Sequence, residues 1–119
     1  MKIKVSEATN IHLDWLVTQI DGWPVTQALT RCKERGRVTL IGGSVFSPST
    51  NWAQGGPIIE REGIDILVEQ RDFKVWAAEI YHSPKGYIRQ KGTTPLIAAM
   101  RCYVASKMGD TVEIPKEIT

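Results

Sequence analysis

The chain has 119 residues, 42% of them hydrophobic and 24% charged, with a formal net charge of +2 at pH 7. This length fits one domain, residues 1–119, with a core of its own, and so small a charge does not single out nucleic acid as a partner. No apolar run reaches the roughly 18 residues of a membrane span, and two cysteines cannot build a disulfide framework. We therefore expect no membrane insertion or secretion, and a reduced cytoplasmic setting.

The N-terminal part predicts a short edge strand followed by two helices. Residues 2–5 alternate polar and apolar side chains, as a strand does. Thr9 or Asn10 can cap the next helix, which ends at Gly22. The apolar stripe of this helix consists of Leu13, Leu16, Val17 and Ile20, at helical spacing. A second helix is predicted from Pro24 to Gly36, because proline favours a helix start and glycine a helix end.

The middle of the chain predicts strands around a polar loop. A strand at residues 37–41 leads to the loop at residues 47–51. A short helix is predicted from Pro57 to Glu62, with proline at its first position. Two strands follow at residues 64–69 and 73–81, and the second is apolar on both faces, which indicates a central position in the sheet.

The C-terminal part predicts a hairpin and the main helix. A turn at residues 83–86 joins the central strand to a strand at residues 87–89. Residues 95–108 form a helix that is apolar around most of its circumference, so it belongs in the core or at a homo-oligomer contact. Residues 112–115 add an edge strand. We expect an α+β fold, with a small antiparallel sheet of about four to five strands packed with N-terminal and C-terminal helices and one short helix.

Catalytic and metal-binding patterns do not emerge from the sequence. His12 and His82 are far apart, and neither Cys32 nor Cys102 has a second cysteine nearby, whereas zinc sites need about four ligands in closely spaced pairs. Cys102 lies in the apolar helix, where a buried structural thiol is expected. We therefore expect no metal, no cofactor and no enzymatic activity.

The loop before the short helix is the candidate ligand site. Trp52 stands among small polar residues, where it can stack on a base or pin the loop to the core. Gly55 and Gly56 precede the predicted helix start at Pro57, where free amides can bind an anion or simply allow a sharp turn. The candidate ligand-binding residues of this loop are Ser49, Thr50, Asn51, Trp52, Gln54, Gly55 and Gly56.

Two small basic clusters, at residues 31–37 and 85–91, suit phosphate groups or are solvated surface. Neither has the density of a nucleic-acid-binding arm, so nucleic acid is the weakest of the partner hypotheses. The arginines that could clamp a phosphate of the ligand are Arg31, Arg35, Arg61 and Arg89.

Four stretches carry a resemblance to a known family. They are residues 47–64, Leu13-Asp14-Trp15 followed by Asp21-Gly22, the isolated Trp76, and residues 94–109. In these stretches the chain resembles the NinX-like family of small proteins encoded by tailed phages and prophages. The resemblance spans most of the chain and is weakest at residues 23–46. It implies phage origin and action in the host bacterial cytoplasm, and it carries no activity.

Three functions are consistent with these patterns. The first is an accessory protein that binds a small nucleotide-like ligand and so sequesters a defence signal. The second is an inhibitor that binds a host protein through the same loop. The third, a nucleic-acid-associated accessory protein, rests on the basic clusters alone.

Overall fold

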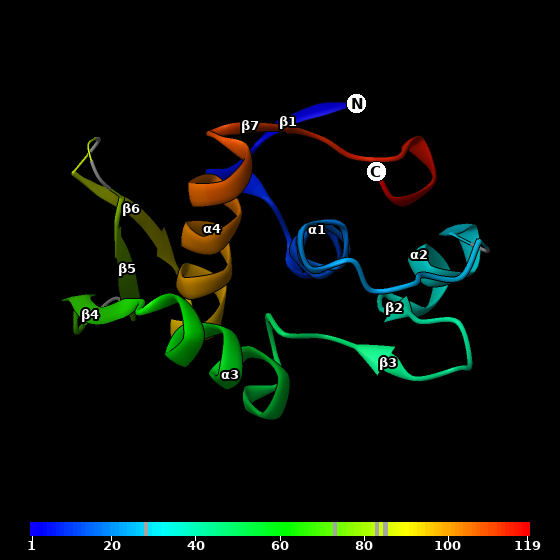
Figure 1. The fold of residues 1–119 in the computed structure, drawn as a ribbon, viewed down its shortest axis with the longest axis horizontal. Helices are drawn as coiled ribbons and strands as arrows, with labels where there is room; N and C mark the ends of the chain where they lie inside the picture. Colours follow the sequence, from blue (N-terminus) through cyan, green and yellow to red (C-terminus); the bar gives the residue numbers. More distant parts are fainter. Residues whose placement is uncertain (28, 73, 83, 85) are drawn as a thin grey trace.

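The computed structural model describes residues 1–27, 29–72, 74–82, 84 and 86–119, and its centre is the helix α4, Pro95–Met108 (Figure 1). Pro95 is the first residue of α4, and the Thr94 hydroxyl accepts a hydrogen bond from Ile97 N at 3.1 Å. Eight of the 14 residues of α4 are buried by other elements of the same chain. The apolar circumference predicted from the sequence is therefore explained by the core, while a homo-oligomer contact through this helix stays a prediction.

Helix α1, Asn10–Asp21, packs against one side of α4 (Figure 1). Thr9 caps α1, and Gly22 ends it in the left-handed conformation with φ 77°, both as predicted. The predicted stripe of α1 packs into the core, with Leu13, Leu16 and Val17 buried and Ile20 partly buried.

The second helix, α2, is shorter than predicted and covers only Leu29–Arg35. The prediction that it begins at Pro24 is wrong, because this segment pairs with the chain around residue 40 instead. Pro24 O accepts a hydrogen bond from Ile41 N at 2.9 Å, and Val25 forms an antiparallel bridge with Leu40. Extended backbone at this position excludes a helix.

The α+β class is confirmed, but the strands form three small antiparallel sheets rather than one. Strands β1, Lys2–Lys4, and β7, Thr111–Glu113, pair with each other, and β2, Val38–Thr39, pairs with β3, Val45–Phe46. The third sheet has the order β4, Asp65–Gln70, β5, Val75–Tyr81, and β6, Tyr87–Gly92. The predicted central strand, β5, is therefore central, and one face of its sheet packs on α4. Short 3₁₀ helices cover Val5–Glu7 and Lys116–Ile118.

Parts of three predicted elements lie outside the described residues: Ala28 of the second helix, Phe73 at the start of the central strand, and Ser83 and Lys85 of the hairpin turn. In the described part of the chain, no helix is both long and apolar enough to cross a membrane.

Helix α3 spans Trp52–Glu62, so the prediction that it begins at Pro57 is wrong. Asn51 caps it, because its Oδ1 accepts a hydrogen bond from Ala53 N at 2.9 Å. Gly55 N donates to Asn51 O at 2.8 Å, which places Gly55 in the first turn of the helix. Pro57 lies inside α3 and has no N–H to donate to the carbonyl of Ala53, four residues earlier.

Candidate functional site

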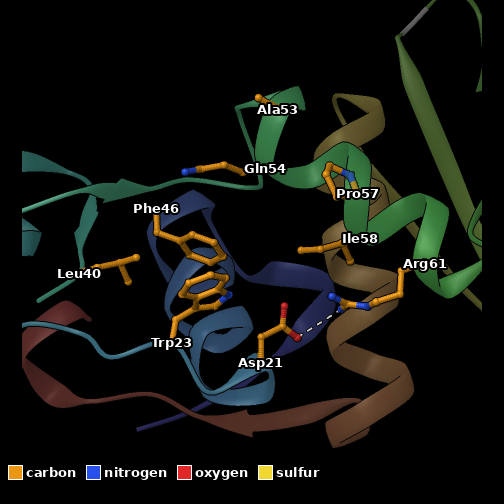
Figure 2. Close-up of a pocket in the computed structure, with 9 residues that line it drawn as sticks. All are labelled: Asp21, Trp23, Leu40, Phe46, Ala53, Gln54, Pro57, Ile58 and Arg61. Atoms are coloured by element: carbon orange, nitrogen blue, oxygen red, sulfur yellow. Dashed lines mark hydrogen bonds and ion pairs between the residues drawn. The ribbon is translucent and has the colours of Figure 1, made fainter.

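A cavity of about 560 Å³ opens between the C-terminal end of α1, the β2–β3 hairpin and α3 (Figure 2). Its size is in the range of small-molecule sites, about 300–1,000 Å³. Most of its walls are apolar, and Asp21 and Arg61 lie at one end. The lining residues are Asp21, Trp23, Leu40, Phe46, Ala53, Gln54, Pro57, Ile58 and Arg61.

Trp23 and Phe46 form the aromatic wall of this cavity. Their ring centroids are 5.8 Å apart and the rings are tilted by 38°, a favourable aromatic pair geometry. Gly22, which ends α1, directs the chain so that Trp23 turns toward the hairpin. Phe46 is buried, whereas 48% of Trp23 is exposed. A half-exposed indole beside a cavity offers a stacking surface for a planar ligand.

The polar end of the cavity is a network around Asp21. Tyr103 from α4 donates its hydroxyl hydrogen to Asp21 Oδ1. Arg61 Nη2 donates to the same oxygen at 3.3 Å and to Tyr103 Oη at 2.9 Å. Burial, together with Asp21, raises the pKa of Tyr103 above its ordinary value, so the phenol stays protonated and acts as a donor.

Further ion pairs balance the charge of Arg61. Its Nε lies 2.8 Å from Glu62 Oε2, and Lys107 Nζ lies 3.3 Å from Glu62 Oε1. Three side-chain atoms at the cavity have no hydrogen-bond partner among the described residues: Asp21 Oδ2, Arg61 Nη1 and Trp23 Nε1. Figure 2 shows one Asp21 oxygen directed at Arg61 and the other pointing away from it. The polar end of the cavity therefore offers one open acceptor, on Asp21, and one open donor, on Arg61, and the Trp23 indole N–H is a further open donor.

Two residues of the predicted ligand set, Gln54 and Arg61, line this cavity. The amide of Gln54 is already bonded, because its Oε1 accepts from Ser47 N at 2.6 Å and its Nε2 donates to Val45 O at 3.0 Å. Gln54 therefore fixes the β3–α3 loop, and Arg61 is the predicted arginine that reaches the cavity.

Other predicted loop residues have structural contacts instead. Ser49 is 1% exposed, and its N donates to Asp14 Oδ1 at 2.9 Å. Asn51 caps α3, and Thr50 is exposed outside the cavity lining. Trp52 is 55% exposed and also lies outside the lining, so the hypothesis that it pins the loop to the core is wrong.

The predicted anion site at the two glycines is contradicted by the position of α3. Gly55 and Gly56 lie within the helix, so they do not form a free amide pair before it. Gly55 is required for close packing, because a Cβ atom there would lie 2.4 Å from Pro48 O. At Gly56 a Cβ atom would meet nothing within 4 Å.

The three other predicted arginines lie elsewhere. Arg31 and Arg35 line a separate cavity of about 130 Å³ beside the buried Cys32. Arg89 forms ion pairs with Glu69 and Glu79 on the three-stranded sheet. Across the described residues, no group of three or more metal-binding side chains comes together.

Seven residues of the cavity lining were not in the predicted ligand set: Asp21, Trp23, Leu40, Phe46, Ala53, Pro57 and Ile58. The only local signal was a large aromatic residue directly after the glycine that ends α1, at Trp23. Its partner Phe46 lies on β3, a two-residue strand that the sequence pattern did not predict.

The fold and the cavity define a small α+β protein with an aromatic-lined pocket of ligand size. The family model described as "Bacteriophage P22, NinX" matches residues 4–107, and the chain belongs to this family. The structure is similar to the 2.0 Å crystal structure of a phage protein from Bacillus cereus ATCC 14579, with a TM-score of 0.56, 16% sequence identity, and coverage of 83% of this chain and 87% of that chain. This likeness shows the fold alone. No curated protein matches the sequence.

Proposed function

We propose that this phage protein binds a small nucleotide-like ligand in the cavity beside Trp23, and that it sequesters such a molecule, for example a defence signal, in the host bacterial cytoplasm. The observation that carries the proposal is the half-exposed indole of Trp23 next to the open oxygen of Asp21 and the open nitrogen of Arg61. A planar ring stacked on the indole would point its polar edge at this pair.

The open atoms of Asp21 and Arg61 favour a particular kind of ligand edge. Asp21 Oδ2 accepts a hydrogen bond and Arg61 Nη1 donates one, so together they complement an N–H and a neighbouring C=O. Nucleobases such as guanine and uracil carry this arrangement. The base is therefore the part of the ligand that enters the cavity.

A phosphate is not expected at the same end of the cavity. The charge of Arg61 is already matched by Asp21 and Glu62, and a phosphate there would lie close to the Asp21 carboxylate. The role of phosphate clamp that the sequence suggested for Arg61 is therefore replaced by a role in base recognition, and any phosphate of the ligand lies toward the opening.

The contacts supply more interaction free energy than the loop site that the sequence suggested. One stacked base contributes about 1–3 kcal/mol, and each hydrogen bond to a charged group contributes about 1.5–3 kcal/mol. Burial of the remaining ring surface against the apolar walls adds about 25 cal/mol per Å². Together these terms approach the roughly 8 kcal/mol of micromolar binding. The site predicted from the sequence, with one base stacked on Trp52 and one anion at a helix start, could not reach this value.

Calorimetry with a panel of nucleosides and nucleotides tests this proposal. Trp23→Ala should weaken binding about 5- to 150-fold, the loss of one stacked base. Trp52→Ala is the matched control, because Trp52 is similarly exposed but lies outside the cavity lining. Asp21→Asn should change the preference among bases, because the amide can present a donor as well as an acceptor. Equal binding by the parent and Trp23→Ala would exclude this site.

A protein partner is the second candidate function, and exposed apolar side chains near the cavity favour it. Ile41 is 68% exposed and Val45 is 37% exposed on the β2–β3 hairpin, beside Trp23. A host protein could cover these side chains. A parent protein that binds no nucleotide, but captures one host protein through Trp23, would favour this function. Binding that weakens steeply with salt would instead indicate nucleic acid.

A further inference from the structure

A second cavity, of about 470 Å³, lies where β6 ends and the chain turns toward α4. It shares no lining residue with the cavity beside Trp23. None of its lining residues is acidic, although Arg89, Lys91 and Arg101 are cationic. Three further side chains can donate neutral hydrogen bonds: Ser6, Gln90 and Thr93. The lining is therefore rich in donors and has no carboxylate.

Arg101 carries the uncompensated charge of this cavity. Its Nη2 and Nε donate to Ala8 O at 2.9 and 3.3 Å, and its Nη1 donates to Lys91 O at 2.9 Å. These acceptors are neutral carbonyls, and no ion pair joins Arg101 to a carboxylate of the described residues. Burial without a carboxylate lowers the pKa of Arg101 from its ordinary value. The guanidinium is therefore held in a fixed position and lacks an anionic partner.

The remaining hydrogen-bonding capacity of Arg101 suits an oxyanion. A guanidinium has five N–H groups, and the bonds to Ala8 and Lys91 use three of them. One N–H on each terminal nitrogen is left, and such a pair binds two oxygens of one anion side by side. The other two cations differ, because Arg89 and Lys91 both form ion pairs with Glu69.

The hydroxyl groups of Ser6 and Thr93 supply donors from other elements. Both residues are exposed, and neither hydroxyl forms a hydrogen bond to another described residue. A carboxylate would be satisfied by the two N–H groups of Arg101 alone, whereas a tetrahedral phosphate has further oxygens for these hydroxyls.

We propose that this second cavity binds the phosphate group of a small phosphorylated molecule, held by Arg101 and by the hydroxyls of Ser6 and Thr93. The site is independent of the ligand cavity beside Trp23. A bound phosphate would give Arg101 the anionic partner that none of the described residues provides.

Titration with inorganic pyrophosphate, followed by amide chemical shifts at constant ionic strength, tests the site. We expect saturable shifts centred on Gly92 and Thr93, weaker shifts from acetate, which cannot use the hydroxyls of Ser6 and Thr93 as well, and none from chloride. Arg101→Lys should weaken pyrophosphate binding about tenfold or more, because an ammonium cannot bind two oxygens side by side. Arg31→Lys is the matched control, since Arg31 lines a different cavity, and it should leave binding unchanged.

Thr93→Val keeps the test valid if Arg101→Lys lowers the melting temperature, because the Thr93 hydroxyl holds no described contact. It should weaken pyrophosphate binding about threefold to tenfold, the value of one hydrogen bond. Similar affinities of pyrophosphate and of the phosphate end of ADP for this cavity would support recognition of the phosphate alone, and Trp23→Ala should not alter the affinity for pyrophosphate. Unchanged pyrophosphate affinity in both Arg101→Lys and Thr93→Val would overturn the proposal. An equal loss of affinity in Arg31→Lys, or tighter binding of single-stranded oligonucleotides than of pyrophosphate, would also overturn it.

Discussion

Two adjacent glycines of α3 should respond to the same substitution in opposite directions. Alanine is favoured over glycine inside a helix by about 1 kcal/mol. At Gly56 a Cβ atom meets no heavy atom within 4 Å, so Gly56→Ala should keep this gain. At Gly55 the Cβ atom would lie 2.4 Å from Pro48 O and 2.6 Å from Leu96 Cδ2.

The clash at Gly55 outweighs the gain in helix propensity. The leucine methyl group can rotate away, but the Pro48 carbonyl belongs to the backbone of the loop before α3. Overpacking of this kind costs about 1–3 kcal/mol, and so close a backbone contact belongs at the upper end. We therefore expect Gly55→Ala to lower the free energy of unfolding by about 2 kcal/mol, after the gain of about 1 kcal/mol is subtracted.

Urea and thermal unfolding followed by circular dichroism measure the difference. With about 4 °C per kcal/mol for a chain of this size, the two variants should melt about 12 °C apart, on opposite sides of the parent. Shifts of the same sign in both variants would refute the reasoning, because they would mean that α3 does not pack on Pro48 or does not include both glycines.

Three further predictions concern the core. Burial raises the pKa of Asp14 from 3.8 to about 7, so the native state holds a proton that the unfolded state has lost, and stability should fall as pH rises from about 4 to about 7. In Asp14→Asn the amide oxygen can still accept the hydrogen bond from Ser49 N, but the side chain no longer titrates. The variant should therefore lose this pH dependence of the unfolding free energy, which is on the order of 2 kcal/mol between pH 5 and 8 in urea titrations. Parallel stability profiles of the parent and the variant across this pH range would contradict the prediction. Burial also raises the pKa of Cys102 to about 12, so Cys102 should resist alkylation at pH 8 in the native protein, whereas the unfolded, unreduced protein should titrate as two thiols, Cys102 and Cys32. Met100→Asp places a charge at a fully buried position of α4 and should abolish the cooperative melt, because the cost of several kcal/mol is comparable with the whole stability of a domain.

The sequence predicted elements whose signals are local. Thr94 and Pro95 begin α4 because the cap and the fixed proline angle act within one turn. Gly22 ends α1 for a similarly local reason, its positive φ. The start of α3 was misplaced because Pro57 carries a strong local signal, whereas the true start depends on the Asn51 cap and on packing of Gly55.

The candidate site could be predicted only in part, because its residues meet through long-range contacts. Arg61 was selected, but its partner Asp21 is 40 residues away in sequence. Trp52 was selected for its polar neighbours in sequence, whereas Trp23 lies at the cavity because a distant hairpin brings Phe46 against it. Residues 24–26 were predicted as the start of a helix because Pro24 suggested one, but they pair with residues 39–41, which is a tertiary effect that periodicity cannot reveal.

The central helix is also one of the last elements to be synthesised. Helix α1 and the sheet β4–β5–β6 present their apolar faces to α4, yet α4 begins only at Pro95. Strand β1, at the start of the chain, cannot pair until its partner β7, at residues 111–113, has been synthesised. A nascent chain on the ribosome can therefore form local helices and hairpins, but it cannot bury them until translation has passed residue 113. The core of this protein therefore closes only once α4 and β7 are both present.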